Sequence, residues 1–570
     1  MNNILARGKK VLMAPQETIL SAASVIMVMI VASRVLGLVR QRVLLSFYVP
    51  GELSLFFAAF RLPDLVFEVL TLGALSSAFI PVFTKLLKKD EEEAWETASR
   101  VVNLGLAMFI VVALAFGLMA HWLYQRVAPG YSLMETNEMA NLARILFAAQ
   151  GFFVVSYVVT GVLESKRRFL MPALAPLFYN LGIIAGTVLF SNRFGLIGPA
   201  IGVVIGAVAH FLVQLPLAYR MGFRFSLDFK PDESVKQIGA LAAPRILELS
   251  VLQVSKTVEL FLASMISTAA YTYYTLANSV QLIPVGLFGV SLAKAALPTL
   301  TREADDLPQF RRTFLKTWYQ VVFLVMPLAT ILIVLRIPVV RLLFGTNIFE
   351  WEATVQTGLV LSAFAVGVPF QASVMLLNRA FYALGDTKTP VAISLVGVII
   401  TIVGGLLMVL EFSYPTWALS VAFSAGVIFQ AVVLFYALSR KLNGGTFFGV
   451  LPIIKSILAS ICSGGVMFFF LKLFDRSVWV KRLSFIIDIN AVSNLNFESF
   501  VLDTRYTSNL LILTTITASL GLAVYLMVSI LLKSGELAVF WNVVKSRRFA
   551  PLPKKEVEQM APNPEGGVEG

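Results

Sequence analysis

The most regular feature of the sequence is a series of long apolar runs separated by short polar segments. A membrane-spanning helix needs about 20 mostly apolar residues, because the hydrocarbon core is about 30 Å thick. About fourteen runs meet this length. They lie near residues 20–47, 54–83, 101–120, 140–163, 170–190, 196–219, 237–262, 269–300, 313–335, 356–383, 390–410, 416–438, 448–474 and 509–532. The runs are continuous rather than alternating, so the pattern predicts an all-α polytopic membrane protein and excludes a transmembrane barrel.

Composition supports the membrane interpretation. Hydrophobic residues make up 58% of the 570 residues and charged residues only 14%, whereas a soluble protein carries about 25% charged residues. This excludes a soluble enzyme, a disordered protein and a disulfide scaffold. The single cysteine, Cys462, excludes an internal disulfide. His121 and His210 lie far apart in the sequence, so we expect neither a metal site nor a cofactor.

The net charge of +13 is explained by topology. Lysine and arginine gather in alternate loops, as in Lys85–Lys89, Lys166–Arg168 and Arg311–Arg312. Cytoplasmic loops carry this excess of basic residues, which places the N-terminus inside. An even number of spans then places both termini in the cytoplasm, and nucleic-acid binding is not expected.

Two weak repeats suggest how the spans are grouped. The loop Glu164–Phe169 precedes Pro172, and the loop Gly385–Thr389 includes the residue before Pro390, six spans later. Parallel repeats of this kind occur in transporters whose site lies between the two halves. We expect a cytoplasmic N-terminus (1–19), an N-lobe of six helices (20–220), a C-lobe of six helices (237–440), two further helices (448–533) with a long external loop (475–508), and a partly disordered cytoplasmic tail (534–570).

Charged residues inside two spans form single-faced stripes. A basic residue at the centre of a span costs about 2.5–3.5 kcal/mol on insertion scales, so a stripe of charges cannot face lipid. It must line a wet cavity or form a salt-bridge ladder that ties helices together, and we favour the cavity. The stripes are Arg61, Asp64 and Glu68 in span two, and Arg245, Glu248, Lys256 and Glu259 in span seven.

Span one adds further arginines without matching acids. Arg34, Gly37 and Gln41 share one face, and Arg40 adjoins Gln41. A guanidinium binds phosphate through two hydrogen bonds and stays charged on burial. We therefore expect a phosphate or pyrophosphate site in a membrane cavity. The sequence contains no Gly-rich phosphate loop, catalytic triad or zinc-binding helix motif, so no enzymatic activity is expected.

Five segments, in order, resemble the MurJ/MviN family of lipid II flippases, and the resemblance covers nearly the whole chain. They are Ser33-Arg34-Val35-Leu36-Gly37-Leu38-Val39-Arg40, Phe56-Phe57-Ala58-Ala59-Phe60-Arg61-Leu62-Pro63-Asp64, the stretch from Gly73 to Phe83, the stretch from Pro284 to Val290, and the stretch from Arg379 to Thr387.

The resemblance implies a fold and an activity. The family belongs to the MOP exporter superfamily, and its members are expected to have fourteen helices, with two six-helix lobes in a V around a central cationic cavity and two last helices that form a hydrophobic groove for the lipid tail. The implied activity is transport of lipid II, the lipid-linked peptidoglycan precursor, from the inner to the outer leaflet of the bacterial cytoplasmic membrane by alternating access. Membrane lipids and cell-wall synthesis proteins are the implied further partners.

The resemblance also assigns residues. Arg34, Arg40 and Arg61 match cavity arginines of the family. The chain departs from the family pattern at three positions: Gln41 stands where many relatives have aspartate, Ser54 where an acid is common, and Ser279 where we align an arginine. We expect these residues to line the cavity and Lys256 to supply the missing positive charge. The alternative is that Lys256 only neutralises Glu259. Spans eleven and twelve contain no acid, so sodium coupling is not expected.

Glycine and proline mark two expected hinges, at Gly73–Pro81 and at Pro284–Gly289, the latter including Gly286. These residues weaken the helical hydrogen bonds where the lobes would bend. The alternative is close helix packing through small residues.

Two other functions share part of this pattern. A related exporter of drugs, or of another polyprenyl-linked glycan, shares the fold but would lack the arginine cluster. A membrane-embedded glycosyltransferase or phosphatase would need a constellation of catalytic acids or histidines at the outer face, and the only point in its favour is the long external loop, where Asp488 and Asp503 lie.

Overall fold

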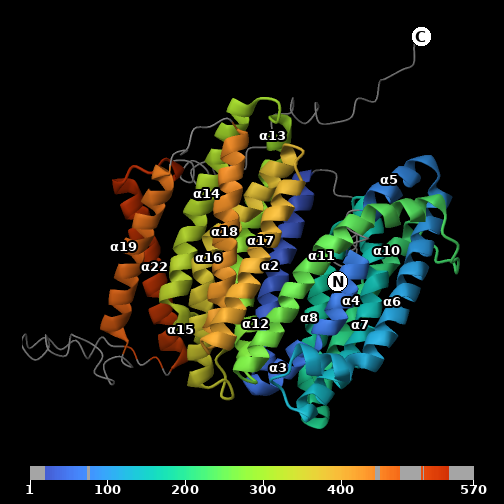
Figure 1. The fold of residues 1–570 in the computed structure, drawn as a ribbon, viewed down its shortest axis with the longest axis horizontal. Coiled ribbons are helices and arrows are strands. Elements are labelled where there is room, and N and C mark those ends of the chain that lie inside the picture. The colour runs from blue at the N-terminus through green and yellow to red at the C-terminus, as the bar shows by residue number, and fades with distance from the viewer. Residues whose placement is uncertain are drawn as a thin grey trace, which may run out of the picture.

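The described structure is helical and polytopic, as the apolar runs predicted. The computed structural model describes residues 19–72, 78–442, 450–475, 502, 504 and 506–537. Within these ranges, twelve helices are long and apolar enough to cross a membrane. Figure 1 shows them running side by side in one broad bundle. The only strand-like pairing among the described residues is a single bridge between Asp475 and Leu502.

The first apolar run forms α2 (Ile19–Leu44), but the second run is broken into α3 (Pro50–Ala59), α4 (Arg61–Phe67) and the π-helix η1 (Glu68–Leu72). The break follows from Pro63, which has no N–H to donate to the carbonyl four residues earlier. The Tyr124 hydroxyl donates to that carbonyl, Ala59 O, at 2.8 Å. A side chain from another helix thus replaces the missing backbone hydrogen bond.

The remaining N-terminal helices pack as adjacent hairpins. They are α5 (Ile80–Lys89), α6 (Glu91–Val127), α7 (Leu133–Ser165), α8 (Leu170–Phe194), α9 (Ile197–Leu212) and α10 (Leu215–Arg220). Glycines bring α8 and α9 into backbone contact: a Cβ at Gly182 would lie 2.4 Å from Gly206 Cα, and one at Gly186 would lie 2.3 Å from Gly202 Cα. Small residues allow this close approach in membranes.

The second half of the chain repeats several of these features. It contains α11 (Glu233–Ile266), α12 (Ala270–Pro284), the π-helix η3 (Val285–Val290), α13 (Ser291–Arg302), α14 (Leu307–Val334), α15 (Arg336–Phe344), α16 (Trp351–Ala383), α17 (Lys388–Leu406), the π-helix η4 (Leu407–Glu411) and α18 (Trp417–Lys441). A Cβ at Gly426 of α18 would lie 2.5 Å from Gly397 O of α17, so this hairpin is also joined through glycines.

The loop before α17 is fixed by one carboxylate. Gly385 has a left-handed φ of 74°, which glycine adopts without steric cost. Asp386 accepts hydrogen bonds from the Thr389 N–H and hydroxyl and pairs with Lys441 at 2.7 Å. The Lys441 ammonium, together with the Thr389 N–H, lowers the pKa of Asp386 to about 2.

The last two helices, α19 (Leu451–Phe474) and α22 (Thr507–Leu531), lie at one edge of the bundle (Figure 1). The Tyr525 hydroxyl donates to Phe323 O at 2.9 Å and attaches α22 to α14. Residues 1–18, most of the predicted 475–508 loop and residues 538–570 of the predicted tail lie outside the described residues.

The two helix groups meet along α2 and α11. Helices α3 to α10 gather on one side of Figure 1 and α12 to α18 on the other. Helix α2 contacts α8 in the first group and α12 and α15 in the second, while α11 contacts α6 and α17. These two helices position the charged residues described next.

Candidate functional site

A continuous polar chain joins α4, η1 and α11. Arg61 is buried, with 4% of its surface exposed, and donates to Gln253 Oε1. Gln253 Nε2 donates to Glu68, and Lys256 Nζ lies 2.9 and 3.1 Å from the two Glu68 carboxylate oxygens. The described ion pair of Lys256 is therefore with Glu68 on another helix, and not with Glu259 on its own helix.

The other acids of the two stripes have separate environments. Asp64 accepts a hydrogen bond from Gln150 Nε2 of α7 at 2.7 Å. Glu259 faces α12, where its carboxylate interacts with Tyr274. The side chains of Arg245 and Glu248 lie outside the described ones.

Arg40 of α2 reaches the second polar group. Its Nη1 donates to Asn180 Oδ1 of α8 at 3.0 Å. Tyr179, next to Asn180, interacts electrostatically with both Arg40 and Asp64, so this arginine and the α4 stripe share one polar region. The Nε atoms of Arg40 and Arg61 are buried and have no hydrogen-bond acceptor in the described part of the chain. Buried donors without acceptors are rare because they carry a desolvation penalty.

Arg34 lies at the edge of a cavity. Its guanidinium packs on Gly286, where a Cβ would lie 3.2 Å from Arg34 Nη2. The cavity has a volume of about 430 Å³ and is bounded by α2, α7, α8 and α9. Its polar lining residues are Ser33, Arg34, Tyr157, Thr160, Glu164 and His210.

His210 belongs to the packing of this region. It is buried, its Nδ1 lies 2.7 Å from Ser156 Oγ, and Gln214 Nε2 donates to Ser156 Oγ at 3.0 Å. The histidine therefore ties α7 to α9 at the floor of the Arg34 cavity. In the described residues no group of three acidic, histidine or cysteine side chains could hold a metal ion.

Two of the three departures from the family pattern contact each other. Ser279 Oγ of α12 donates to Gln41 Oε1 of α2 at 3.0 Å. Ser54 is fully buried and accepts a hydrogen bond from Thr272 N at 3.0 Å. Each contact joins an N-terminal helix to α12 through neutral groups.

The second expected hinge coincides with irregular backbone. Pro284 ends α12, and η3 contains Gly286 and Gly289. A Cβ at Gly289 would lie 2.9 Å from Ala372 Cα of α16, so this glycine also serves close packing. Pro81 stands in the first turn of α5, whereas Gly73 lies outside the described residues.

Sequence reasoning found the arginines and acids but missed their amide partners. Gln150, Asn180 and Gln253 bind Asp64, Arg40 and Arg61, respectively. Uncharged amides do not stand out in an apolar run. One signal was available for Gln253, because it precedes Lys256 by three residues and so shares its helical face.

Comparisons with known proteins agree on one family. A family model described as "Lipid II flippase MurJ" matches residues 47–491. A probable lipid II flippase MurJ of Thermotoga maritima is 27% identical over 72% of this chain and 84% of its own length. The lipid II flippase MurJ of Burkholderia cenocepacia is 27% identical over 72% of this chain and 81% of its own.

Solved structures share the fold. A lipid II flippase MurJ in an inward closed conformation superposes with a TM-score of 0.72 at 22% identity, covering 89% of this chain and 98% of the other. An inward-facing multidrug resistance MATE family transporter of the MOP superfamily gives a TM-score of 0.62 at 14% identity, covering 72% of this chain and 94% of the other.

Proposed function

The chain belongs to the MurJ lipid II flippase family, and from that premise we propose that it moves lipid II from the inner to the outer leaflet of the bacterial cytoplasmic membrane. The observation that carries this function is the family match over residues 47–491. The activity is transport without covalent chemistry. The match also disfavours the exporter of drugs or other glycans and the membrane-embedded glycosyltransferase.

Arg34, Arg40 and Arg61 are proposed to bind the pyrophosphate of the substrate. The proposal is supported by the two buried Nε–H groups that lack an acceptor among the described residues and by the cavity beside Arg34. A phosphate oxygen accepts such donors strongly, because hydrogen bonds between charged groups are about twice as strong as neutral ones. The bound headgroup is proposed to be surrounded by Gln41, Asp64, Glu68, Lys256, Glu259 and Ser279. Arg245 and Glu248 would lie nearer the N-terminus of α11.

Transport is proposed to proceed by alternating access between an N-lobe of residues 20–220 and a C-lobe of residues 237–440. The π-helix η3 would bend because its wider turns and its glycines weaken the regular hydrogen-bond ladder. Both termini are proposed to be cytoplasmic, on the loop charges alone. Cell-wall synthesis proteins that supply or use lipid II are the proposed protein partners.

The test is rescue of bacteria depleted of their own lipid II flippase. Cells expressing this chain should grow and keep their shape. Arg34→Lys, Arg40→Lys and Arg61→Lys keep the charge but lose the bidentate geometry. Loss of one charged hydrogen bond, about 1.5–3 kcal/mol, should lower transport at least tenfold in each variant.

Arg126→Lys is the matched control, because Arg126 is exposed in the last turn of α6 and stacks on Trp122. It should rescue fully at equal membrane expression. Failure of the unaltered chain to rescue would contradict the proposed function. Full rescue by all three lysine variants would contradict only the pyrophosphate site.

A further inference from the structure

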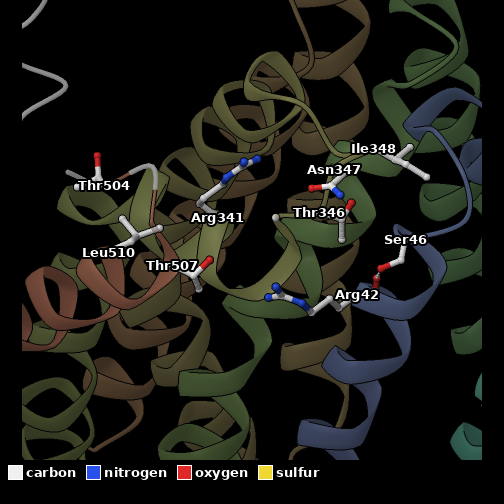
Figure 2. A pocket seen from close by; sticks show the side chains of 10 residues that line it. Arg42, Ser46, Arg341, Thr346, Asn347, Ile348, Thr504, Thr507 and Leu510 are labelled. Atoms are coloured by element: carbon white, nitrogen blue, oxygen red, sulfur yellow. Dashed lines mark hydrogen bonds between the residues drawn. The ribbon is translucent and has the colours of Figure 1, made fainter.

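A second polar pocket lies away from the residues discussed above. It has a volume of about 430 Å³, within the range of ligand-binding pockets. It lies where α2, α15 and α22 meet, at the end of the bundle opposite α5 and α13 (Figure 1). The lining residues are Arg42, Ser46, Arg341, Gly345, Thr346, Asn347, Ile348, Thr504, Thr507 and Leu510 (Figure 2).

Among the described lining residues the pocket carries two positive charges and no negative charge, and the neighbouring carboxylate of Asp475 accepts a hydrogen bond from the Thr504 hydroxyl at 2.9 Å. Arg42 stands in the last turn of α2 and Arg341 in the last turn of α15. Neither guanidinium forms an ion pair with a carboxylate of the described residues. Three threonines, one serine and one asparagine supply the remaining polar groups.

Backbone carbonyls hold both arginines in place. Arg42 Nη1 donates to Leu342 O, and Arg341 Nη1 donates to Phe349 O at 2.9 Å. A guanidinium has five N–H donors, so an arginine that is oriented through one donor retains others for an anion. The segment between them is also fixed, because Thr346 Oγ1 donates to Leu45 O at 2.7 Å and accepts from Phe349 N at 3.0 Å.

We propose that this pocket binds a phosphate group through Arg42 and Arg341. Two oriented guanidinium groups without a carboxylate partner favour a doubly charged or bridging anion, and phosphate matches their planar fork. The Ser46 hydroxyl donates to Arg42 O at 2.9 Å, while the hydroxyl group of Thr507 lies in the same lining and can donate to a further phosphate oxygen. The phosphate can belong to a membrane lipid headgroup or to a free phosphate ion, and the two sources are separated below. The inference is independent of the transport activity.

A purely structural role is the competing explanation, because both arginines also tie helices and loops together. That role needs one hydrogen bond from each side chain and no anion. The two explanations differ in what happens when the charge of the pocket is cancelled without removing either arginine. Ser46 is exposed, so Ser46→Asp should place a carboxylate in the pocket and leave the fold intact.

The experiment measures phosphate binding to the purified full-length protein. In detergent, inorganic pyrophosphate is titrated by calorimetry. In the lipid arm, native mass spectrometry counts molecules of dioleoyl phosphatidylglycerol or dioleoyl phosphatidylcholine retained from mixed nanodiscs. We expect one binding equivalent to weaken at least tenfold in Arg42→Gln/Arg341→Gln and in Ser46→Asp. Binding at Arg34, Arg40 or Arg61 is unchanged by these variants and appears as a constant background.

The control is Arg126→Gln/Arg193→Gln, which removes the same charge from exposed arginines near the corresponding ends of α6 and α8. Loss of pyrophosphate binding alone supports the site and assigns a free phosphate. Loss of phosphatidylglycerol retention, with phosphatidylcholine unaffected, supports the site and assigns a lipid headgroup. Equal binding in the unaltered protein and Ser46→Asp, or an equal loss in the control, would overturn the proposal.

Discussion

Several charged side chains in the centre of this protein have a specific polar neighbour on another helix. Lys256 illustrates this, since its partner Glu68 lies on a different helix and within 3.1 Å of its ammonium. The two side chains are 45% and 26% exposed, so water reaches the pair, and its electrostatic contribution is about 1 kcal/mol or less. An ion pair of this strength does not by itself account for two charged residues inside the membrane.

The Lys256–Glu68 pair can be tested by removing one charge or both. Lys256→Met or Glu68→Gln alone leaves a partly buried charge unpaired and should reduce both thermal stability in detergent and transport. The double variant should regain stability, because no unpaired charge remains. We expect it to remain inactive, since Lys256 is proposed to contact substrate. Recovery of transport together with stability would assign Lys256 a structural role only.

The contact between Gln41 and Ser279 predicts a second coupled pair. Ser279→Arg alone would bury a guanidinium against a neutral amide, and the desolvation penalty should lower the amount of folded protein and its melting temperature. Adding Gln41→Asp places a carboxylate at the other end of the 3.0 Å contact and should restore both. Thermal unfolding of the single and double variants measures the coupling. Additive effects would show that the two side chains do not interact.

The sequence predicted which charges lie within the spans but not how they pair. The positions of Arg34, Arg40 and Arg61 followed from the cost of placing arginine in a membrane. The partners did not follow, because Glu68 meets Lys256 only after η1 packs against α11, and this packing is set by the break at Pro63. Local spacing favoured Glu259, which lies three residues from Lys256, so the local pattern selected the wrong partner.

At the scale of elements, most of what the apolar runs did not predict concerns the irregular helices. The run 54–83 predicted one span with a hinge at Gly73–Pro81, whereas the structure divides it into α3, α4 and η1 and places its last residues in α5. Pro63 lacks the N–H that would bond to Ala59 O, but nothing in the local sequence indicated that Tyr124 of α6 would satisfy this carbonyl. Helix α15 was also not predicted. It is separated from α14 by a change of backbone conformation at Leu335, and an apolar leucine gives no sign of a break.

The bond between Tyr124 and Ala59 O predicts the result of a double-mutant cycle. Tyr124→Phe leaves a buried carbonyl without its donor and should lower the free energy of unfolding by about 1–3 kcal/mol. In a Pro63→Ala background a backbone N–H is available for the same carbonyl, so Tyr124→Phe should cost less. Chemical unfolding in detergent measures the free energy of unfolding of the four proteins in the cycle. An equal cost of Tyr124→Phe in both backgrounds would contradict this account of the break.

At the scale of the whole molecule, Glu164 and Lys294 belong to opposite helix groups. Glu164 lies in the last turn of α7 in the first group, Lys294 lies in α13 of the second, and the lysine charge acts on the Glu164 carboxyl. Alternating access requires the separation of the two groups at this point to change. The predicted repeats also belong to this scale, because the α8–α9 and α17–α18 hairpins each begin near a proline and join through glycines.

Linking the two groups at this point should therefore stop transport. Glu164→Cys/Lys294→Cys in a Cys462→Ser background, treated with a short cleavable thiol crosslinker, should lose lipid II transport and regain it after cleavage. Glu91→Cys/Lys166→Cys is the control, because that ion pair joins α6 to the loop after α7 within one group. Unchanged transport by fully crosslinked Glu164→Cys/Lys294→Cys protein would reject relative movement of the groups at this position.

The glycine contacts between α8 and α9 have a consequence for biosynthesis. The glycines of this contact all lie in two consecutive helices, so the contact can form as soon as α9 has left the ribosome and entered the bilayer. The polar chain through Arg61, by contrast, must wait for Gln253 of α11 to be synthesised. The nascent chain therefore holds a completed apolar hairpin before the helix that completes its polar chain arrives. A bulky residue at Gly186 would disturb insertion itself, at a stage when the substrate site does not yet exist.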